Sequence, residues 1–190
     1  MDHEWEVWAM GRAGRVGGTL GLAAAGLVLG VASVAGQESP APAGFSIVGE
    51  WLGLHDCERI VPMLREAGLD ELVQEAVVGN GLVPGSTDPT ALDLTDPCAA
   101  AVPRSHSHFF TEDGSFGSRD YNGAQVDDGA YSVDGDTLSI GGTPFRFSVS
   151  GDALTLEPEL TSGCTTDACL GDNGWRLMVA MPGTTWVRIP

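Results

Sequence analysis

Two histidines, two positions apart, are the residues of this chain best suited to chemistry. His106 and His108 lie in the run Arg-Ser-His-Ser-His-Phe-Phe, and residues at i and i+2 of a β-strand point to the same face. With His55, at the end of an earlier apolar run, they could form a three-histidine zinc site if the two strands are neighbours. The alternative is that all three imidazoles are ordinary polar neighbours in the interior or rim of a barrel. We adopt this second interpretation and expect no tightly bound metal.

Four cysteines form the second group able to do chemistry: Cys57, Cys98, Cys164 and Cys169. Behind an export segment they are expected to oxidise in pairs, which leaves none free to act as a nucleophile. Of the three possible pairings we favour Cys57–Cys98 with Cys164–Cys169, because it ties off two insertions separately. The longer loop implies roughly 4 kcal/mol of stabilisation and the shorter about 2. A metal held by the Cys-x4-Cys pair is the alternative, although that spacing is poor for zinc.

Other catalytic or binding motifs are missing from the sequence. There is no Gly-x-Ser-x-Gly nucleophile motif and no phosphate-binding glycine loop ahead of a helix. Asp120, Asp127 and Asp128 flank a Gly-containing loop, but they lack the alternating spacing of a calcium loop and are better interpreted as solvated turn residues. We therefore predict that the protein is not an enzyme and needs no cofactor.

The elements that must position these residues are short strands separated by tight turns. Between Ser105 and Glu157, apolar and polar residues alternate around three turn sequences, Glu112-Asp-Gly, Asp134-Gly-Asp and Gly151-Asp. Asp-Gly and Gly-Asp pairs supply the positive φ that short hairpin loops need. Consecutive hairpins at this spacing predict an antiparallel up-and-down meander that closes into a mainly β barrel of about eight to nine strands.

The remaining segments predict one further strand before the meander and two after it. Residues 45–54 alternate as a first strand, and residues 175–181 and 184–189 alternate as the last two. Between the first and second strands the apolar period changes, which predicts helices at 56–68 and 69–78. A loop over 160–174 is expected to carry the last two cysteines.

One short motif carries a family resemblance. Gly49-Glu50-Trp51, near the start of the meander, resembles the Gly-x-Trp signature of the lipocalins and lipocalin-like barrels. In that family an Arg of the last strand covers the Trp at the closed end of the barrel, and Arg188 holds the matching position. The resemblance implies structural roles for Gly49, Trp51 and Arg188. The mature chain is also similar to uncharacterised secreted proteins of high-GC actinobacteria, which implies no activity.

The amino-terminal segment of the sequence indicates export. Residues 19–35 carry no charge, two arginines precede them, and Ser33-Val34-Ala35 offers small residues at a cleavage site. We predict a signal peptide over 1–35, with an uncleaved membrane anchor as the alternative and Met1 or Met10 as the start. A flexible spacer follows over 36–44. The barrel domain then spans 45–190, with its helical insertion at 56–98, in a secreted or extracytoplasmic protein.

Charge and fold together limit the function. The chain has 26 acidic against 9 basic residues and a net charge of −17, which disfavours nucleic acid, and also membrane surfaces except through the amino-terminal segment. Small closed barrels either fill with side chains or hold one ligand. We predict a non-catalytic module that binds a small apolar ligand; its expected lining is Phe110, Phe145, Phe147, Leu154 and Trp175. The alternatives are a cell-envelope interaction protein using the helical insertion, and then a metal-dependent hydrolase using the histidines.

Overall fold

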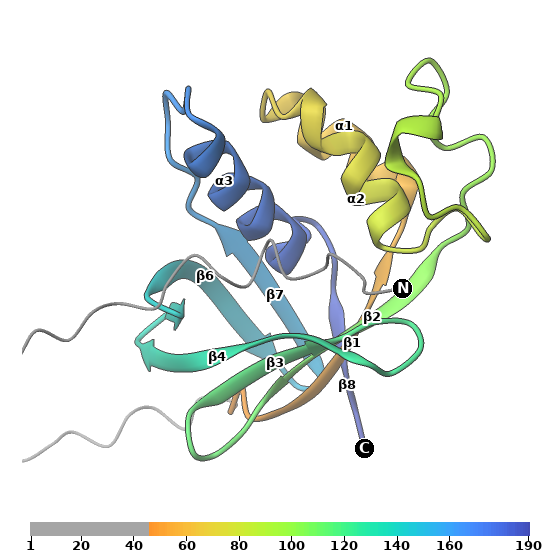
Figure 1. The fold of residues 1–190 in the computed structure, drawn as a ribbon. Coiled ribbons are helices and arrows are strands. Elements are labelled where there is room, and N and C mark those ends of the chain that lie inside the picture. The colour runs from red at the N-terminus through yellow and green to blue at the C-terminus, as the bar shows by residue number, and fades with distance from the viewer. Residues whose placement is uncertain (1–45) are drawn as a thin grey trace, which may run out of the picture. The chain divides into compact units, whose positions relative to one another are not determined.

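The computed structural model describes residues 46–190, so the predicted signal peptide and spacer lie outside the described residues. Eight antiparallel strands form a closed barrel in which each strand pairs with its neighbours in sequence and β8 pairs with β1 (Figure 1). This confirms the predicted fold class. The strands are β1 (Gly49–His55), β2 (Arg104–Phe110), β3 (Ser115–Arg119), β4 (Gln125–Asp134), β5 (Thr137–Ile140), β6 (Thr143–Ser150), β7 (Ala153–Pro158) and β8 (Trp186–Ile189).

All three turn sequences connect strands as expected. They join β2 to β3, β4 to β5 and β6 to β7, and the glycines Gly114, Gly135 and Gly151 adopt φ values of 85°, 60° and 62°. A side chain would disfavour this left-handed conformation, which is why glycine occupies these positions. The turns set the register that points alternate residues of every strand into the barrel.

The insertion after β1 is helical, as predicted. It contains α1 (Cys57–Glu66), the 3₁₀ turn η2 (Asp70–Leu72), α2 (Val73–Gly79) and the 3₁₀ turn η3 (Pro89–Ala91). Asp56 caps α1 by accepting a hydrogen bond from the backbone N–H of Glu58 at 3.2 Å. Pro62 lies inside α1 without moving its start from Cys57. Gly68, with a φ of 72°, follows the end of this helix.

The predicted strand at 175–181 is wrong, and so is the second half of the predicted loop over 160–174, because residues 167–180 form the helix α3 (Asp167–Ala180). Thr166 caps this helix by accepting from the N–H of Cys169, and Met181 ends it in the left-handed conformation. Short apolar runs fit either period, so alternation alone does not distinguish a strand from a buried helix. Close packing of α3 also explains Gly174, where a Cβ atom would overlap the side chain of Leu72.

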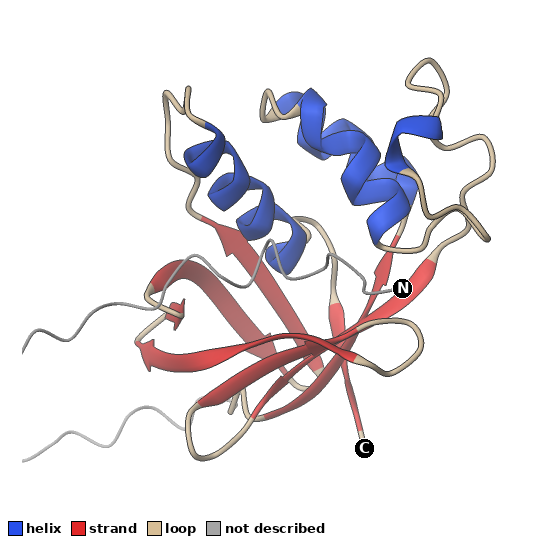
Figure 2. Ribbon diagram, in the orientation of Figure 1, coloured by secondary structure: helices blue, strands red, loops and turns tan. Residues whose placement is uncertain are grey.

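The helices lie together beyond one end of the barrel. Figures 1 and 2 show α1, α2 and α3 on the same side of the strands, with α3 arriving from β7 and α1 continuing β1. We call these three helices the helical cap. Apolar residues of the cap, including Ile60, Leu64, Val77 and Leu177, share one buried core with the barrel interior. The cap and the barrel are therefore packed as one body.

Candidate functional site

The barrel interior is filled by side chains. Trp51 and Trp186 are fully buried, and Phe116, Leu138 and Leu156 are at most 1% exposed. Of the five residues predicted to line a ligand cavity, Phe110, Phe145 and Leu154 are at most 1% exposed and belong to this packed core. Phe147 and Trp175 are only partly buried and lie at its margin. Trp175 comes from α3 and meets Phe145 edge to face.

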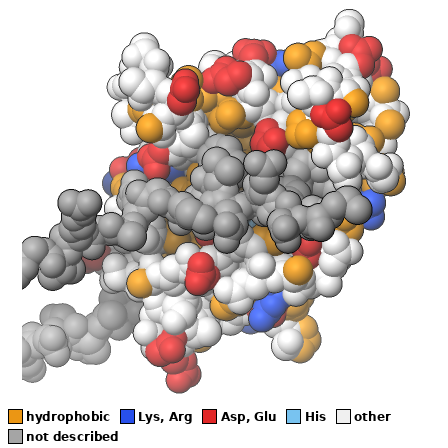
Figure 3. Space-filling view, viewed as in Figure 1, with side chains coloured by type: hydrophobic (Ala, Val, Ile, Leu, Met, Phe, Trp, Pro, Cys, Tyr) orange, Lys and Arg blue, Asp and Glu red, His pale blue; other side chains and the backbone are white. Residues whose placement is uncertain are grey.

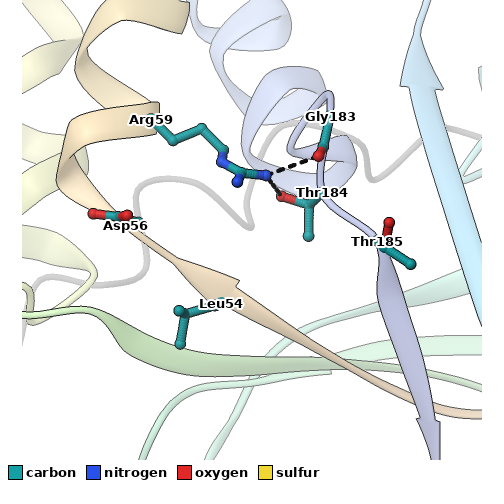
Figure 4. Close-up of a pocket in the computed structure, with 6 residues that line it drawn as sticks. All are labelled: Leu54, Asp56, Arg59, Gly183, Thr184 and Thr185. Carbon is teal, nitrogen blue, oxygen red and sulfur yellow. Dashed lines mark hydrogen bonds between the residues drawn. The ribbon is translucent and has the colours of Figure 1, made fainter.

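Two pockets lie on the outside of the barrel, and neither includes any of those five residues. The first, of about 270 Å³, lies between the β1–α1 junction and the segment that leads into β8 (Figure 4). Its guanidinium, from Arg59, donates to the carbonyl of Gly183 at 2.9 Å and to the hydroxyl of Thr184 at 2.8 Å. The second, of about 230 Å³, lies along the outer side of β1 and the β3–β4 loop, where its lining includes Leu52 and Tyr121.

The three histidines do come together, since β1 and β2 are neighbours. Gly53 is opposite His106 and Trp51 is opposite His108 in the register. The rings of His55 and His106 are stacked, with centroids 4.3 Å apart and planes inclined by 12°, and those of His106 and His108 are 5.0 Å apart. Stacked rings do not direct their nitrogens to one point. Within residues 46–190, no group of three His, Cys, Asp or Glu side chains is arranged to hold a metal ion.

Hydrogen bonds fix the protonation of two of these rings. His108 donates from Nε2 to the carbonyl of Val179 at 2.9 Å and accepts at Nδ1 from the hydroxyl of Ser118 at 2.8 Å. His55 donates from Nδ1 to the side-chain carbonyl of Asn80 at 3.2 Å. Its Nε2 is buried without any hydrogen-bond partner.

All three imidazoles are held neutral. Burial, reinforced by the neighbouring imidazoles, lowers the pKa of His55 and of His106 to about 3 each. Burial likewise lowers the pKa of His108 to about 3, even though its hydrogen bond to Val179 favours the charged form. His55 and His108 are thus buried neutral rings, while His106 is partly buried and lines the second pocket.

The three aspartates considered for calcium do not converge either. Asp120 accepts from the backbone N–H groups of Asn122 and Ala124, so it serves the β3–β4 turn. Asp127 faces inward, opposite Ser118, and accepts from Nε1 of Trp175 at 3.0 Å. Burial raises the pKa of Asp127. Asp128 is exposed.

Both favoured disulfides are present. Cys57–Cys98 ties the start of α1 to the end of the insertion, and Cys164–Cys169 closes the loop ahead of α3. No cysteine is free among the described residues. Two disulfides indicate an oxidising, extracytoplasmic environment. In the described part of the chain, no helix has the length and apolar character needed to cross a membrane.

One surface feature was not identified from the sequence: an uncharged outer face that crosses five neighbouring strands. Its first row follows the register from Ser107 through Leu52, Val187 and Ala153 to Ser150. Its second row contains Ser105 and Leu54, and then Thr155 and Ser148, whose hydroxyls are hydrogen-bonded at 2.8 Å. We call these nine residues the outer face.

The outer face carries three large apolar side chains that are exposed. Leu52, Leu54 and Val187 are 39%, 52% and 52% exposed. Within the insertion, Leu94 is the large apolar side chain that is similarly exposed. Acidic side chains, by contrast, are spread over both the cap and the strands on the side of the molecule seen in Figure 3. Leu52 and Leu54 alternate with the inward residues of β1, so the sequence pattern places both leucines outside. That they lie beside residues of β7 and β8 follows only from the strand register.

Comparison with known proteins adds no assignment to this geometry. No protein-family model matches the chain, and its sequence matches none of the curated proteins compared with it. The closed eight-stranded antiparallel barrel is consistent with a lipocalin-like architecture.

Proposed function

We propose that this protein is a non-catalytic, extracytoplasmic binding module that docks a protein partner on its outer face. The observation that carries the proposal is the absence of charge from the nine residues of this face, in a chain with a net charge of −17. The packed barrel interior supports a scaffold role. The nearest charged residues on these strands, Glu50, Arg146 and Glu157, occupy the next outward positions beyond the two rows, and Arg119 of β3 is opposite Ser107.

The physical argument is one of desolvation. Docking strips water from a surface, which is costly for charges and favourable for apolar groups. Covering the outer face costs the least desolvation free energy. Burial of Leu52, Leu54 and Val187 is favourable, and the serines and threonines of the face can form hydrogen bonds with a partner. Charged residues are depleted from the cores of protein interfaces for the same reason.

The uncharged, partly apolar character of the outer face also indicates what surface a partner must have. A complementary surface must be uncharged at its centre, since a buried lone charge would remain unpaired against leucine and valine. Three exposed apolar side chains amount to a small apolar centre, which suits a transient rather than an obligate complex. The dispersed acidic residues around the face favour partners without a strongly acidic rim.

The test compares two variants that each introduce arginine on a barrel strand. Leu52→Arg/Val187→Arg places charge on the outer face, while Val126→Arg places it at an exposed valine of β4 outside that face. The wild-type protein and the two variants, matched in thermal stability, are used as bait with extracts of the native cell envelope. A partner kept by wild type and Val126→Arg but lost from the double variant supports the proposal. Equal retention by all three refutes it.

A small apolar ligand is a second candidate, supported by exposure at one side of the barrel. Phe147 and Trp175 keep partial exposure, and Val133, which lies opposite the buried Leu138, is 46% exposed. A ligand bound at this margin of the barrel would contact these side chains. Binding of a fluorescent fatty acid that is lost in Trp175→Ala and kept in Leu52→Arg/Val187→Arg would favour this function over docking on the outer face.

Classification with the lipocalin-like barrels and export to the cell exterior belong to the same proposal. The Trp51–Arg188 contact and the closed meander support the former. The two disulfides and the predicted signal peptide support the latter. Amino-terminal sequencing of protein from culture medium should find a start near Gly36, and recovery only from membranes with residues 19–35 intact would contradict export by cleavage.

A further inference from the structure

The histidine cluster lies where the helical cap meets the barrel, and it connects the two. His55 belongs to β1 and bonds to Asn80, the residue that ends α2. His108 belongs to β2 and bonds to the carbonyl of Val179 in α3. Asn80 in turn donates to the carbonyl of Ala76 within α2. Two of the three imidazoles therefore each join one barrel strand to one cap helix.

The third imidazole connects the other two. His106 is stacked on His55 and lies edge to face against His108, and all three rings contact Trp186. None of the described residues hydrogen-bonds to the ring of His106. The ring centroid of His106 lies 4.3 Å from that of His55 and 5.0 Å from that of His108. At such distances two protonated rings in a poorly hydrated site repel each other strongly.

Protonation of His55 would also leave a hydrogen-bond donor without an acceptor. Nε2 of His55 is buried and has no partner, so a proton there would become a buried N–H that nothing receives. At His108 a proton on Nδ1 would only reverse the hydrogen bond with Ser118, whose hydroxyl can accept as well as donate, so the cost there is that of burying the charge. The charged forms are therefore disfavoured by burial, by the neighbouring rings and, at His55, by a missing acceptor, and separating the cap from the barrel would relieve these costs by admitting water.

In the part of the chain that the structure describes, no carboxylate in direct contact with the three rings would stabilise their protonated forms. From β4, the inward carboxyl of Asp127 is opposite Ser118 and already accepts from Trp175. From β2, Arg104 is directed to Tyr121 and the carbonyl of Gly81. From β8, Arg188 covers Trp51, and from α3, Arg176 pairs with Asp172. On α1, Arg59 bonds to Gly183 and Thr184, while Glu58 and Glu66 are exposed; on α2, Glu75 is partly exposed.

We propose that His55, His106 and His108 form an acid-operated latch, which holds the helical cap on the barrel while neutral and releases it when protonated. The strongly lowered pKa values of the three rings agree with this, since they measure how much the closed arrangement disfavours the charged forms. The Cys57–Cys98 disulfide and the chain connections keep the released cap attached, so the release is reversible.

Hydrogen exchange on the complete mature protein tests the latch between pH 7.5 and 4.5. The amides followed are those of α2 and the last turn of α3, compared with β5 and β6 in the barrel, after correction for intrinsic exchange. Opening that takes up two or three protons should raise the cap's opening constant by about a hundred-fold to a thousand-fold per pH unit below the pKa of a free imidazole. The strands β5 and β6, which open only on global unfolding, should keep a much smaller opening constant than the cap at every pH.

His106→Phe provides the decisive variant, because a phenyl ring keeps the stack, cannot take up a proton and leaves no hydrogen-bond partner unsatisfied. It should reduce the pH dependence of cap opening by about tenfold per pH unit. Leu138→Val, a cavity-forming change at a buried site on β5, is the control that weakens the fold without changing the number of protons. If His106→Phe does not fold, His106→Gln serves the same purpose.

Three results would overturn the latch. They are a cap opening constant that does not change with pH, an opening constant that is the same for α2 as for β5 and β6 at every pH, and an unaltered pH dependence in the His106 variant. The second would indicate ordinary global acid unfolding, and the third would assign the effect to groups outside the cluster.

Discussion

The guanidinium of Arg188 lies over the ring of Trp51, with its central carbon 4.1 Å from the ring centroid. Arg188 and Trp51 are opposite one another where β8 closes the barrel against β1. The same guanidinium donates to the carbonyl of Ser46 at 2.7 Å and to that of Val48. Gly49 lies beside it, at a φ of 137°, where a Cβ atom would overlap the arginine. One side chain thus covers the indole and satisfies the backbone that leads into β1.

Replacing Arg188 should test how much this contact stabilises the barrel. Cation–π contact and lost packing together predict a loss of roughly 1–2 kcal/mol in the free energy of unfolding for Arg188→Ala. Arg188→Lys should lose nearly as much, because lysine keeps the charge but not the planar stack or the two-carbonyl fork. Urea unfolding measures both. A loss below about 0.5 kcal/mol for either variant would show that the contact contributes little.

Gly53 should not tolerate a side chain. A Cβ atom there would lie 2.5 Å from ring carbons of Trp186, which is itself fully buried. Gly53→Ala is therefore expected to lower the free energy of unfolding by about 1–3 kcal/mol through overpacking. Gly129→Ala on β4 is the control, since its Cβ would meet nothing within 4 Å. Thermal unfolding distinguishes the two, and equal shifts would contradict the steric explanation.

Stability should fall as the pH falls through the range in which free histidine titrates. The folded pKa of each clustered histidine, about 3, is below its unfolded value of 6.5. The unfolded chain therefore binds more protons between these values, and the stabilisation present above pH 6.5 is lost on acidification. Each ring contributes a slope of about 1.4 kcal/mol per pH unit, and all three together about 4. Urea titrations between pH 7 and 5 measure the slope, and a flat profile would mean that the rings are accessible.

The two disulfides should differ in what they stabilise. Cys57→Ser/Cys98→Ser opens a loop with a sequence separation of 41, and Cys164→Ser/Cys169→Ser one of 5. The chain-entropy model predicts losses of about 4 and about 2 kcal/mol. The first pair of substitutions should loosen the insertion while the strands persist. Proteolysis with mass spectrometry should find early cleavage within residues 57–98, and cleavage that begins in the strands would contradict this.

The sequence alone determined the barrel, because the information it needs is local. Asp-Gly and Gly-Asp turns and two-residue alternation specify hairpins without any knowledge of the rest of the chain, and a chain of hairpins has few ways to bury its apolar faces. Asp56 and Gly68 marked the ends of the first helix for the same reason. The positions of Cys57 and Cys98 on either side of that insertion were enough to predict their pairing.

Tertiary structure decided what local pattern left open. Residues 175–181 fit a strand as well as a helix, and the contact of Gly174 with Leu72, together with the cap at Thr166, resolves them as part of α3. Whether the barrel is filled depends on how Trp51 and Trp186 pack across it, which no sequence spacing encodes. The stacking of His55 on His106 and the joining of Leu52 to Val187 and Ala153 likewise exist only in the register of the closed sheet. Such contacts bring distant positions together, and their energies depend on burial that the folded chain alone provides.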